Sequence, residues 1–254
     1  MSGQPTSNYQ KILASIAKEE MIARATVTHA PAGIEIGAEM LIYDYAADRT
    51  EGSLGYAELD VQVVAFAHDL MHKTGSKSTK CQLAEGEFEV FVDVFPPPPT
   101  LVIFGAVHIA IPLVKMAKEV GFRVKVIDGR SKFLTKERFP EADDLIEAWP
   151  DELGDQVKFD SNTYVVILSH DEKFDEPALE TTLPTAARYI GAIGSRTTTA
   201  KRVERLKQQG VPDEQIARIH GPVGLPIGAR EPAEIAVSIM AEIIAVKYGV
   251  APKS

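Results

Sequence analysis

The sequence predicts an α/β protein in which a small α+β domain, residues 1–95, precedes a domain built on a parallel sheet, residues 100–254. The second part alternates short, wholly apolar runs with helical segments, which is typical of strands buried on both faces of a doubly wound sheet. Residues 96–99 are four consecutive prolines, which lack backbone N–H donors and form a stiff spacer roughly 12 Å long. We interpret them as a linker, the alternative being an ordinary loop before a strand.

The composition narrows the class of protein. The chain has 254 residues, 27 Lys and Arg against 36 Asp and Glu, a formal charge of −9, and one cysteine. This acidity disfavours nucleic-acid binding, and a single cysteine gives no internal disulfide. No apolar run is long enough to span a bilayer or resembles a signal peptide. We therefore expect a cytoplasmic protein that binds neither nucleic acid nor membrane.

The first domain begins with a helix that Ser7 caps, with Ile12, Leu13 and Ile16 on one apolar face. The pattern then predicts, in order, strands at 23–29 and 39–45, a helix at 56–72, and strands at 79–83 and 87–95 joined by a turn at 84–86.

Two features of the first domain have alternative interpretations. His68 and His72 stand four residues apart on a predicted helix, as metal ligands do, but histidines are also favoured in a helix's last turn. Cys81 lies in a predicted strand, where a lone cysteine is most often a small buried side chain and less often a sulfur or metal ligand. We expect no metal site.

The second domain alternates strands with helices. The predicted strands span 101–104, 123–128, 164–168 and 189–193, and the predicted helices span 109–120, 176–183 and 198–209. A last helix starts at Pro232, a favourable first-turn residue, and carries an apolar stripe from Ile235 to Ile244.

Glycines and polar residues follow the predicted strands of this domain. In an open parallel sheet, ligands bind beyond the carboxyl ends of the strands. The sequence therefore predicts a binding site formed by the residues at four strand ends: Gly105, His108, Asp128, Arg130, His170, Asp171, Gly194, Ser195 and Arg196. Helix capping is the alternative role for Ser195, and a polar first-turn position is the alternative for His108.

The loop after the first of these strands is similar to a dinucleotide fingerprint. Residues 105–110 begin with Gly105 and end with Ala110, and Asp128 stands about 20 residues downstream, where an acid would bind ribose. Val107 replaces the second glycine, and its branched side chain would obstruct the approach of a pyrophosphate. The scaffold is thus Rossmann-like, while Val107 disfavours NAD(P). An NAD(P)-binding oxidoreductase and a non-catalytic protein that has kept the fold both remain alternatives.

Four segments together resemble the XdhC/CoxI family of accessory factors for molybdenum hydroxylases, such as xanthine dehydrogenase and carbon monoxide dehydrogenase. They read LVIFGAVHIAIPLVKMAKEVGFRVKVIDGR, TYVVILSHDEKFD, YIGAIGSR and RIHGPVGLPIGAREPAEIAVSIMAEIIAV. The resemblance adds His220 and Gly224, with Pro222 and Leu225, to the strand-end residues as family-pattern positions.

The resemblance also implies a function. It implies a cytoplasmic chaperone, rather than a self-standing enzyme, that binds molybdenum cofactor (molybdopterin), assists its sulfuration and delivers it to a molybdenum hydroxylase apo-enzyme. A sulfurtransferase partner and a homodimer are implied as well. The sequence departs from the family pattern at Val107, and at residues 52–58, which lack paired glycines and a thiol. Cys81 is not at the matching place.

Overall fold

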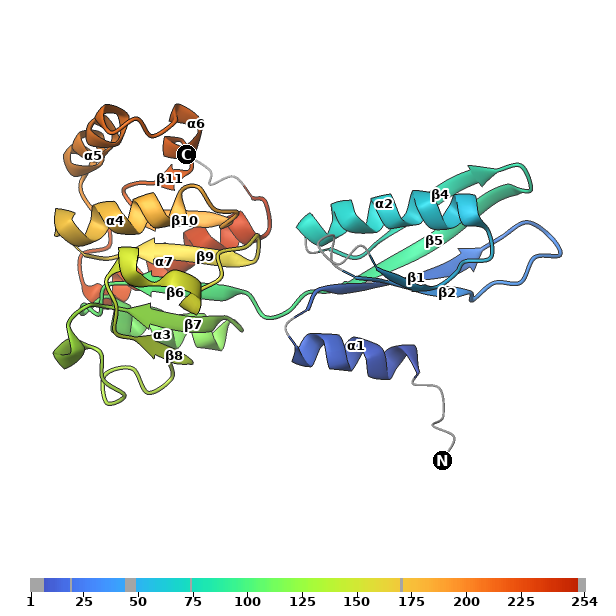
Figure 1. The fold of residues 1–254 in the computed structure, drawn as a ribbon, viewed down its shortest axis with the longest axis horizontal. Coiled ribbons are helices and arrows are strands. Elements are labelled where there is room, and N and C mark those ends of the chain that lie inside the picture. The colour runs from blue at the N-terminus through green and yellow to red at the C-terminus, as the bar shows by residue number, and fades with distance from the viewer. Residues whose placement is uncertain (1–6, 19, 44–48, 74, 170, 251–254) are drawn as a thin grey trace. The chain divides into compact units, whose positions relative to one another are not determined.

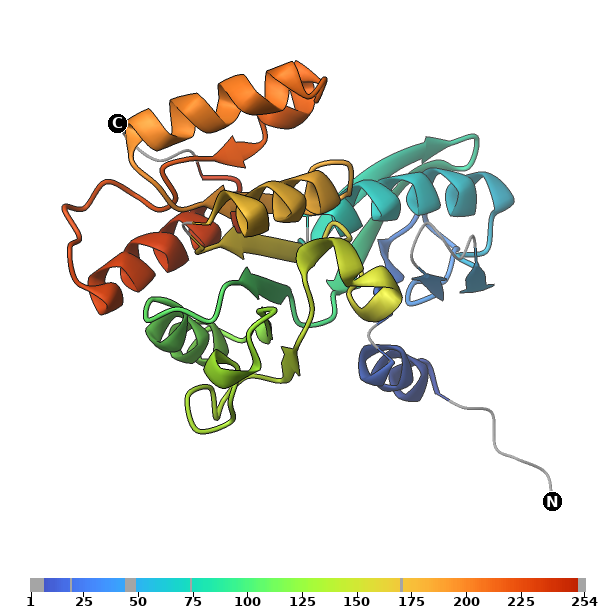
Figure 2. The ribbon, with the colours of Figure 1, turned by 60° about the vertical axis from the view of Figure 1, so that its left-hand side comes forward.

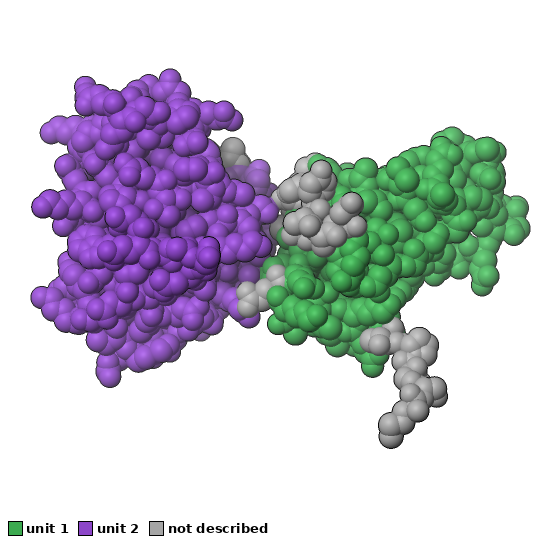
Figure 3. All heavy atoms as spheres, viewed as in Figure 1, with its two compact units in different colours: residues 1–97 green, residues 98–254 purple. Residues whose placement is uncertain are grey.

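The computed structural model describes residues 7–18, 20–43, 49–73, 75–169 and 171–250. The chain divides into two compact units, residues 1–97 and 98–254 (Figure 3), and the division falls within the run of prolines.

Unit 1 is an α+β unit (Figure 1). Its described residues form an antiparallel sheet with the strand order β3-β2-β1-β5-β4. Helix α2 packs against the sheet and closes a core that includes Leu59, Val63 and Phe88. The elements are α1 (Asn8–Ala17), β1 (Ile22–His29), β2 (Glu39–Tyr43), β3 (Thr50–Gly52), α2 (Ala57–Lys73), β4 (Lys77–Leu83) and β5 (Gly86–Phe95).

Helix α1 begins as predicted, because the Ser7 hydroxyl accepts a hydrogen bond from the backbone N–H of Gln10. Ile12 is buried and Ile16 packs beside it on the core. The prediction that Leu13 shares this face was wrong, since its side chain is 47% exposed. Residues one apart on a helix differ by about 100° in direction, so Leu13 turns away from the stripe that Ile12 and Ile16 form.

The two ambiguous features of unit 1 have simple surroundings. Cys81 is buried opposite Phe88, and burial raises the pKa of its thiol. The His68 Nε2 atom lies 3.3 Å from the carbonyl oxygen of Tyr43. The side chain of His72 lies outside the described residues. In the part of the chain that is described, no three His, Cys, Asp or Glu side chains group as metal ligands would.

Unit 2 is built on a parallel sheet with the strand order β11-β10-β9-β6-β7-β8, counting the strands of the described residues. This confirms the predicted fold class. The order reverses beside β6, so the first strand has β9 on one side and β7 on the other. The elements are β6 (Thr100–Phe104), α3 (Ala110–Glu119), β7 (Arg123–Ile127), η2 (Ser131–Phe133), β8 (Asp144–Ile146), η3 (Pro150–Glu152), η4 (Gly154–Gln156), β9 (Thr163–Ile167), α4 (Glu172–Thr182), β10 (Tyr189–Ala192), α5 (Arg196–Gln208), α6 (Asp213–Ile216), β11 (Ile219–His220) and α7 (Pro232–Lys247).

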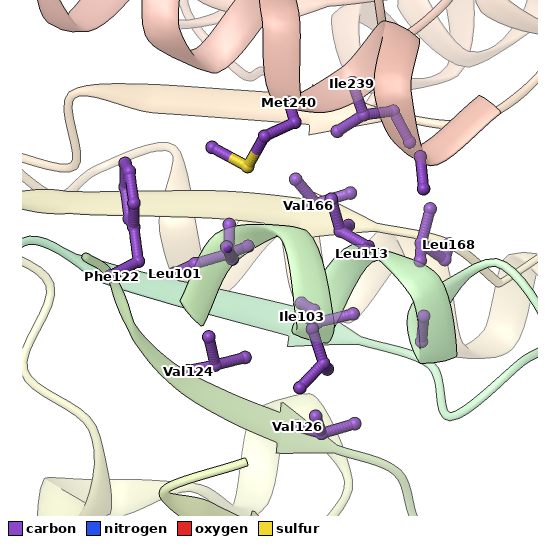
Figure 4. Close-up of a cluster of buried hydrophobic side chains, with 14 of the residues drawn as sticks. Leu101, Ile103, Leu113, Phe122, Val124, Val126, Val166, Leu168, Ile239 and Met240 are labelled. Carbon is purple, nitrogen blue, oxygen red and sulfur yellow. The ribbon is translucent and has the colours of Figure 1, made fainter. Parts of the chain in front are cut away.

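Helices cover both faces of this sheet (Figures 1 and 2). On one face, α3 and α7 pack against each other and against the strands. Figure 4 shows Leu113 of α3 and Ile239 of α7 beside Ile103 and Val166 of the sheet. On the other face, α4 and α5 cover Val102 and Val165. This two-sided burial explains the continuous apolar runs in the sequence.

The sheet has more strands than predicted, because β8 and β11 add one strand at each edge. Each is three residues or fewer, which is too short for a periodic hydrophobic pattern to develop. No helix of the described residues is long and apolar enough to cross a membrane.

Candidate functional site

A pocket of about 640 Å³ lies beyond the carboxyl ends of β6, β7 and β9. Parallel strands present these ends at one edge of the sheet, and the reversal of strand order beside β6 leaves a crevice there. The lining residues come from the loops that follow the three strands: Val107, Arg130, Ser169, Asp171, Glu172 and Lys173. The pocket is thus where the topology places ligands in folds of this kind.

Arg130 is held in one orientation by Asp128. The Nε and Nη2 atoms of Arg130 each donate to an oxygen of the Asp128 carboxylate, at 2.9 Å. The same carboxylate accepts the backbone N–H groups of Ala106, at 2.8 Å, and Arg130, at 3.0 Å. The Asp128 side chain is 1% exposed, while that of Arg130 is 51% exposed. One edge of the guanidinium is therefore fixed, and its Nη1 group bonds to no residue among those described.

These bonds set the ionisation of Asp128. Burial alone would raise the pKa of its carboxyl, but the hydrogen bonds from Arg130 and from the backbone N–H of Ala106 outweigh burial and lower the pKa. Because the pKa is lower in the folded state than in the unfolded chain, this ionised carboxylate stabilises the fold above about pH 4. The stabilisation is lost as the pH falls through the folded-state pKa.

We expect Asp128→Asn to lower the free energy of unfolding by about 1–3 kcal/mol at neutral pH, because an amide cannot accept all four hydrogen bonds. Urea unfolding at neutral and acid pH measures this, and the gap between variant and wild type should narrow as the pH falls. Asp171→Asn is the matched control, since Asn caps a helix about as well as Asp. An equal loss in the two variants would contradict the role of Asp128.

The use of Asp128 bears on dinucleotide binding. In a dinucleotide site this acid binds ribose, and the N–H groups of the preceding loop bind pyrophosphate. Here the carboxylate is buried under Arg130 and occupies the N–H of Ala106. Val107 lines the pocket where the fingerprint would have glycine. These contacts argue against NAD(P) as the ligand.

Gly105 has a structural reason to be glycine. Its φ is +106°, and a Cβ there would stand 3.1 Å from the backbone nitrogen of Ser169. The loops after β6 and β9 therefore approach closely beneath the pocket. His108 follows on the same loop before α3, is exposed, and does not belong to the pocket lining.

The loop after β9 forms the third wall of the pocket. Ser169 accepts the backbone N–H of Asp171 at 3.0 Å, and Asp171 caps α4 by accepting the backbone N–H of Lys173 at 3.1 Å. Lys173 and Glu172 project from the first turn of α4 into the lining. His170 falls outside the described residues, so its predicted role stays a prediction.

A buried ion pair lies behind this wall. The Arg202 Nη2 atom of α5 stands 3.2 Å from Asp175 Oδ2 of α4 and donates to the carbonyl of Ile193 at 2.9 Å. Burial raises the pKa of Asp175 to about 6, since it outweighs the opposing effects of Arg202 and the Ser169 hydroxyl. The pair ties α4 and α5 together at the ends of β9 and β10.

Ser195 and Arg196 occupy the start of α5, after β10. Ser195 is the N-cap and accepts the backbone N–H of Thr198 at 3.1 Å. Arg196 is exposed, and neither residue lines the pocket. Gly194 precedes them and packs closely on Thr198. The capping role that the sequence left open for Ser195 is thus the one its contacts show.

His220 and Gly224 belong to a separate polar network. Glu242 of α7 accepts the hydroxyl of Tyr189 and the backbone N–H of Gly224 at 2.8 Å, and lies 3.3 Å from His220 Nδ1. These partners keep the pKa of Glu242 low despite its burial. Burial raises the pKa of Tyr189. The network fastens the loop after β11 to α7, so His220 and Gly224 have a structural role here.

The charges beside the pocket are mixed. Arg130 and Lys173 stand among the acidic Asp171 and Glu172. In the loop after β7, three cationic side chains surround the ring of Phe133. Those of Arg130, Lys132 and Arg138 lie 4.7, 4.9 and 5.7 Å from the ring centroid. An acidic protein thus presents a local cluster of cations at the exit of β7, suited to an anionic group.

The structure therefore brings Gly105, Asp128, Arg130 and Asp171 together at one pocket. The residues after β10 and β11 do not line it, and their predicted binding role stays a prediction. Sequence reasoning missed Lys173, Asp175 and Arg202. The first two stand close to Asp171 in sequence, at the start of a helix, and that spacing was the available signal. Arg202 lies inside a helix with no local mark of its burial.

Known proteins similar to this chain share the Rossmann-type fold of unit 2. Residues 101–243 match the family model described as the XdhC Rossmann domain. A protein of Bacillus subtilis (strain 168), named as a probable subunit of xanthine dehydrogenase, is 36% identical over 162 residues, which are 64% of this chain and 47% of that protein. The "Molybdenum cofactor insertion chaperone PaoD" of Escherichia coli (strain K12) is 32% identical over 91 residues, 36% of this chain and 29% of that protein.

The fold has a solved counterpart. A crystal structure described as a xanthine dehydrogenase from Bacillus halodurans aligns with a TM-score of 0.55 and 21% identity, covering 96% of this chain and 97% of that chain. At 21% identity, the similarity between the two structures shows a shared fold and nothing about function. The chain spans about half the length, or less, of the curated relatives that it matches. Because the family model covers more than half of the chain, this protein belongs to the XdhC family.

Proposed function

We propose that this protein binds molybdenum cofactor in the pocket beyond β6, β7 and β9 and delivers it to an apo-enzyme of the xanthine dehydrogenase type. The observation that carries the proposal is Arg130, whose guanidinium Asp128 fixes so that one edge stays open at the pocket. The names of the relatives from Bacillus subtilis and Escherichia coli support it.

The residues fit the chemistry of this cofactor. It joins a planar pterin, which carries N–H donors, to a phosphate. Arg130 and Lys173 offer donors to an anion, and the carboxylates of Asp171 and Glu172 offer acceptors to N–H groups. Such a mixed lining suits a ligand with both kinds of group better than a bare phosphate. The pocket, at about 640 Å³, is also within the usual size for small-molecule sites.

Binding rather than turnover is the task of these side chains. The bound cofactor would supply the molybdenum centre of the recipient enzyme. Arg130 would hold the phosphate through its free edge, and Asp128 would keep the guanidinium from reorienting when no ligand is bound. Hydrogen bonds and ion pairs are readily reversible, so the ligand can be handed on without breaking a covalent bond to the chain.

The finer parts of the proposal rest on the family resemblance. They are assistance in sulfuration of the cofactor, a sulfurtransferase partner, a homodimer and a cytoplasmic location. The residues of the pocket itself bear on binding and on none of these.

We expect Arg130→Ala to weaken cofactor retention about tenfold or more, because a charge-assisted hydrogen bond is lost. The test is co-expression of the full chain with a molybdenum hydroxylase, followed by measurement of molybdenum and pterin on the purified protein and of hydroxylase activity. Arg230→Ala, which removes an exposed arginine outside the pocket lining, is the matched control. The proposal would be overturned if the purified wild-type protein carried no cofactor and the hydroxylase were equally active with and without this protein.

Calorimetric titration with NAD and NADH tests the alternative. We expect no binding, because the Asp128 carboxylate already accepts the N–H of Ala106 and the guanidinium of Arg130. Saturable binding of either nucleotide that Asp128→Asn alters would favour an oxidoreductase instead.

A further inference from the structure

Trp149 stands at the same edge of the parallel sheet as the pocket. It comes three residues after the end of β8, and β8 pairs in parallel with β7, which Arg130 follows. The backbone N–H of Asp128 donates to the carbonyl of Ile146 at 3.3 Å, so the chain beyond β8 stays beside the turn at residues 128–130. The indole is 40% exposed, so part of the ring is open to a ligand.

The indole packs directly on the backbone of Gly129. A Cβ at Gly129 would lie 2.9 Å from Trp149 Nε1 and 3.0 Å from Cε2, so a glycine is required for this contact. On another side, the ring of Phe174 lies 5.6 Å away, tilted by 59°. Within the described residues, the indole N–H has no hydrogen-bond partner. Trp149 is therefore held in place by Gly129 and Phe174, while part of its surface stays exposed.

The contact with Gly129 couples the indole to Arg130. The turn that carries Gly129 also carries the guanidinium, and both are fixed by Asp128, which accepts the backbone N–H and the side chain of Arg130. Phe174 follows Lys173, a pocket residue on the opposite wall. An exposed aromatic surface and a fixed cation thus flank one short turn, an arrangement that matches a planar ring joined to an anionic group.

We infer that Trp149 is the stacking surface for the planar nitrogen heterocycle of a ligand whose phosphate Arg130 binds. This inference rests on the proposed function and extends it beyond the pocket lining. The heterocycle is either the pterin of the cofactor or the base of a nucleotide attached to it. The two share their chemistry, and the experiment separates them.

The test uses the full-length protein without alteration. The sequence contains one tryptophan, so intrinsic tryptophan fluorescence reports Trp149 alone. A pterin phosphate (dihydroneopterin monophosphate), CMP and GMP are titrated separately, with N-acetyltryptophanamide titrated in parallel to correct for absorbance. We expect saturable quenching by the pterin phosphate if the pterin stacks, or by CMP or GMP if the base does, and either result supports the inference.

Variants sharpen the test. Calorimetry should show roughly 5- to 150-fold weaker binding of the quenching probe by Trp149→Ala, the range expected for loss of one stacked ring, and near wild-type binding by Trp149→Phe. Tyr9→Ala removes an exposed aromatic side chain from unit 1 and should leave binding unchanged. Urea unfolding of each variant shows whether the fold is intact, and the fluorescence of the wild type needs no variant.

Three results would overturn the inference: probe binding by calorimetry without quenching, binding by Trp149→Ala equal to the wild type, or no binding of any probe. None of these decides the proposed function, because cofactor on the purified protein and hydroxylase activation are measured separately. Conversely, a probe could quench Trp149 although the purified protein never carries molybdenum cofactor. That result would place the ligand in another class and refute the proposed function alone.

Discussion

Arg202→Ala is expected to lower the free energy of unfolding by about 3–5 kcal/mol, one of the two largest effects expected of a single substitution in this protein. The Arg202 side chain is 4% exposed and that of Asp175 6%, so removing the guanidinium leaves a carboxylate buried without its counter-charge. The carbonyl of Ile193 loses its donor as well. Urea unfolding followed by circular dichroism measures the loss.

The matched control is Arg196→Ala, which removes the same side chain six positions earlier on α5. Arg196 is exposed, so we expect a change of at most about 0.5 kcal/mol. A loss in Arg202→Ala no larger than the control's would show that the buried pair contributes nothing to stability.

The pH dependence of this variant follows from Asp175. The folded-state pKa of about 6 lies above that of the unfolded chain, so protonation of Asp175 favours the fold. That contribution is complete below about pH 4 and is lost as the pH rises through the folded-state pKa. Without Arg202 the folded-state pKa rises further. The free energy of unfolding that Arg202→Ala loses relative to the wild type should therefore be smaller at about pH 5 than at about pH 8. A deficit that is constant across this range would contradict the assignment.

Gly224→Ala is expected to cost roughly 2–5 kcal/mol, the sum of backbone strain and overpacking. Gly224 has a φ of +93°, and a Cβ there would collide with the Ser238 hydroxyl and stand 3.0 Å from the backbone nitrogen of Ile239. Helix α7 would have to move away, which also breaks the hydrogen bond from the Gly224 N–H to Glu242. Thermal and urea unfolding of the variant measure the cost.

Gly228→Ala separates the two causes. Gly228 has a φ of +79°, but nothing lies within 4 Å of its Cβ position. We expect this control to lose only the strain, about 1–2 kcal/mol. Equal losses in the two variants would mean that packing on α7 is not what requires glycine at position 224. A normally stable Gly224→Ala protein that fails to bind cofactor would instead assign Gly224 to the ligand.

The fold of unit 2 could be predicted because its signals are local. Continuous apolar runs such as residues 101–104 and 164–168 can be buried on both faces of a sheet, and the helices between them require a parallel arrangement. The edge strands could not be predicted, because β11 is two residues long and owes its place to its neighbour β10.

The sequence predicted the edge of the sheet at which the candidate pocket lies, but only some of the residues that line it. A parallel sheet aligns the carboxyl ends of its strands, so Arg130 and Asp171 were expected at one edge and do line one pocket. The roles of individual residues were harder to predict. Asp128 has the spacing of a ribose ligand, yet its carboxylate binds Arg130 of its own loop and the N–H of Ala106. The contact with Ala106 depends on how the loops after β6 and β7 meet.

The sequence by itself determined the class of fold, the edge of the sheet at which the candidate site lies and the resemblance to the XdhC family, since each depends on residue types in chain order. Tertiary structure alone decided which side chains are free to meet a ligand. Asp128 accepts the backbone N–H of Ala106, 22 residues earlier, and Arg202 pairs with Asp175, 27 residues earlier. Trp149 gains its position from a glycine 20 residues away. Burial, charge pairing and close packing are properties of neighbours in space, and chain order does not specify those neighbours.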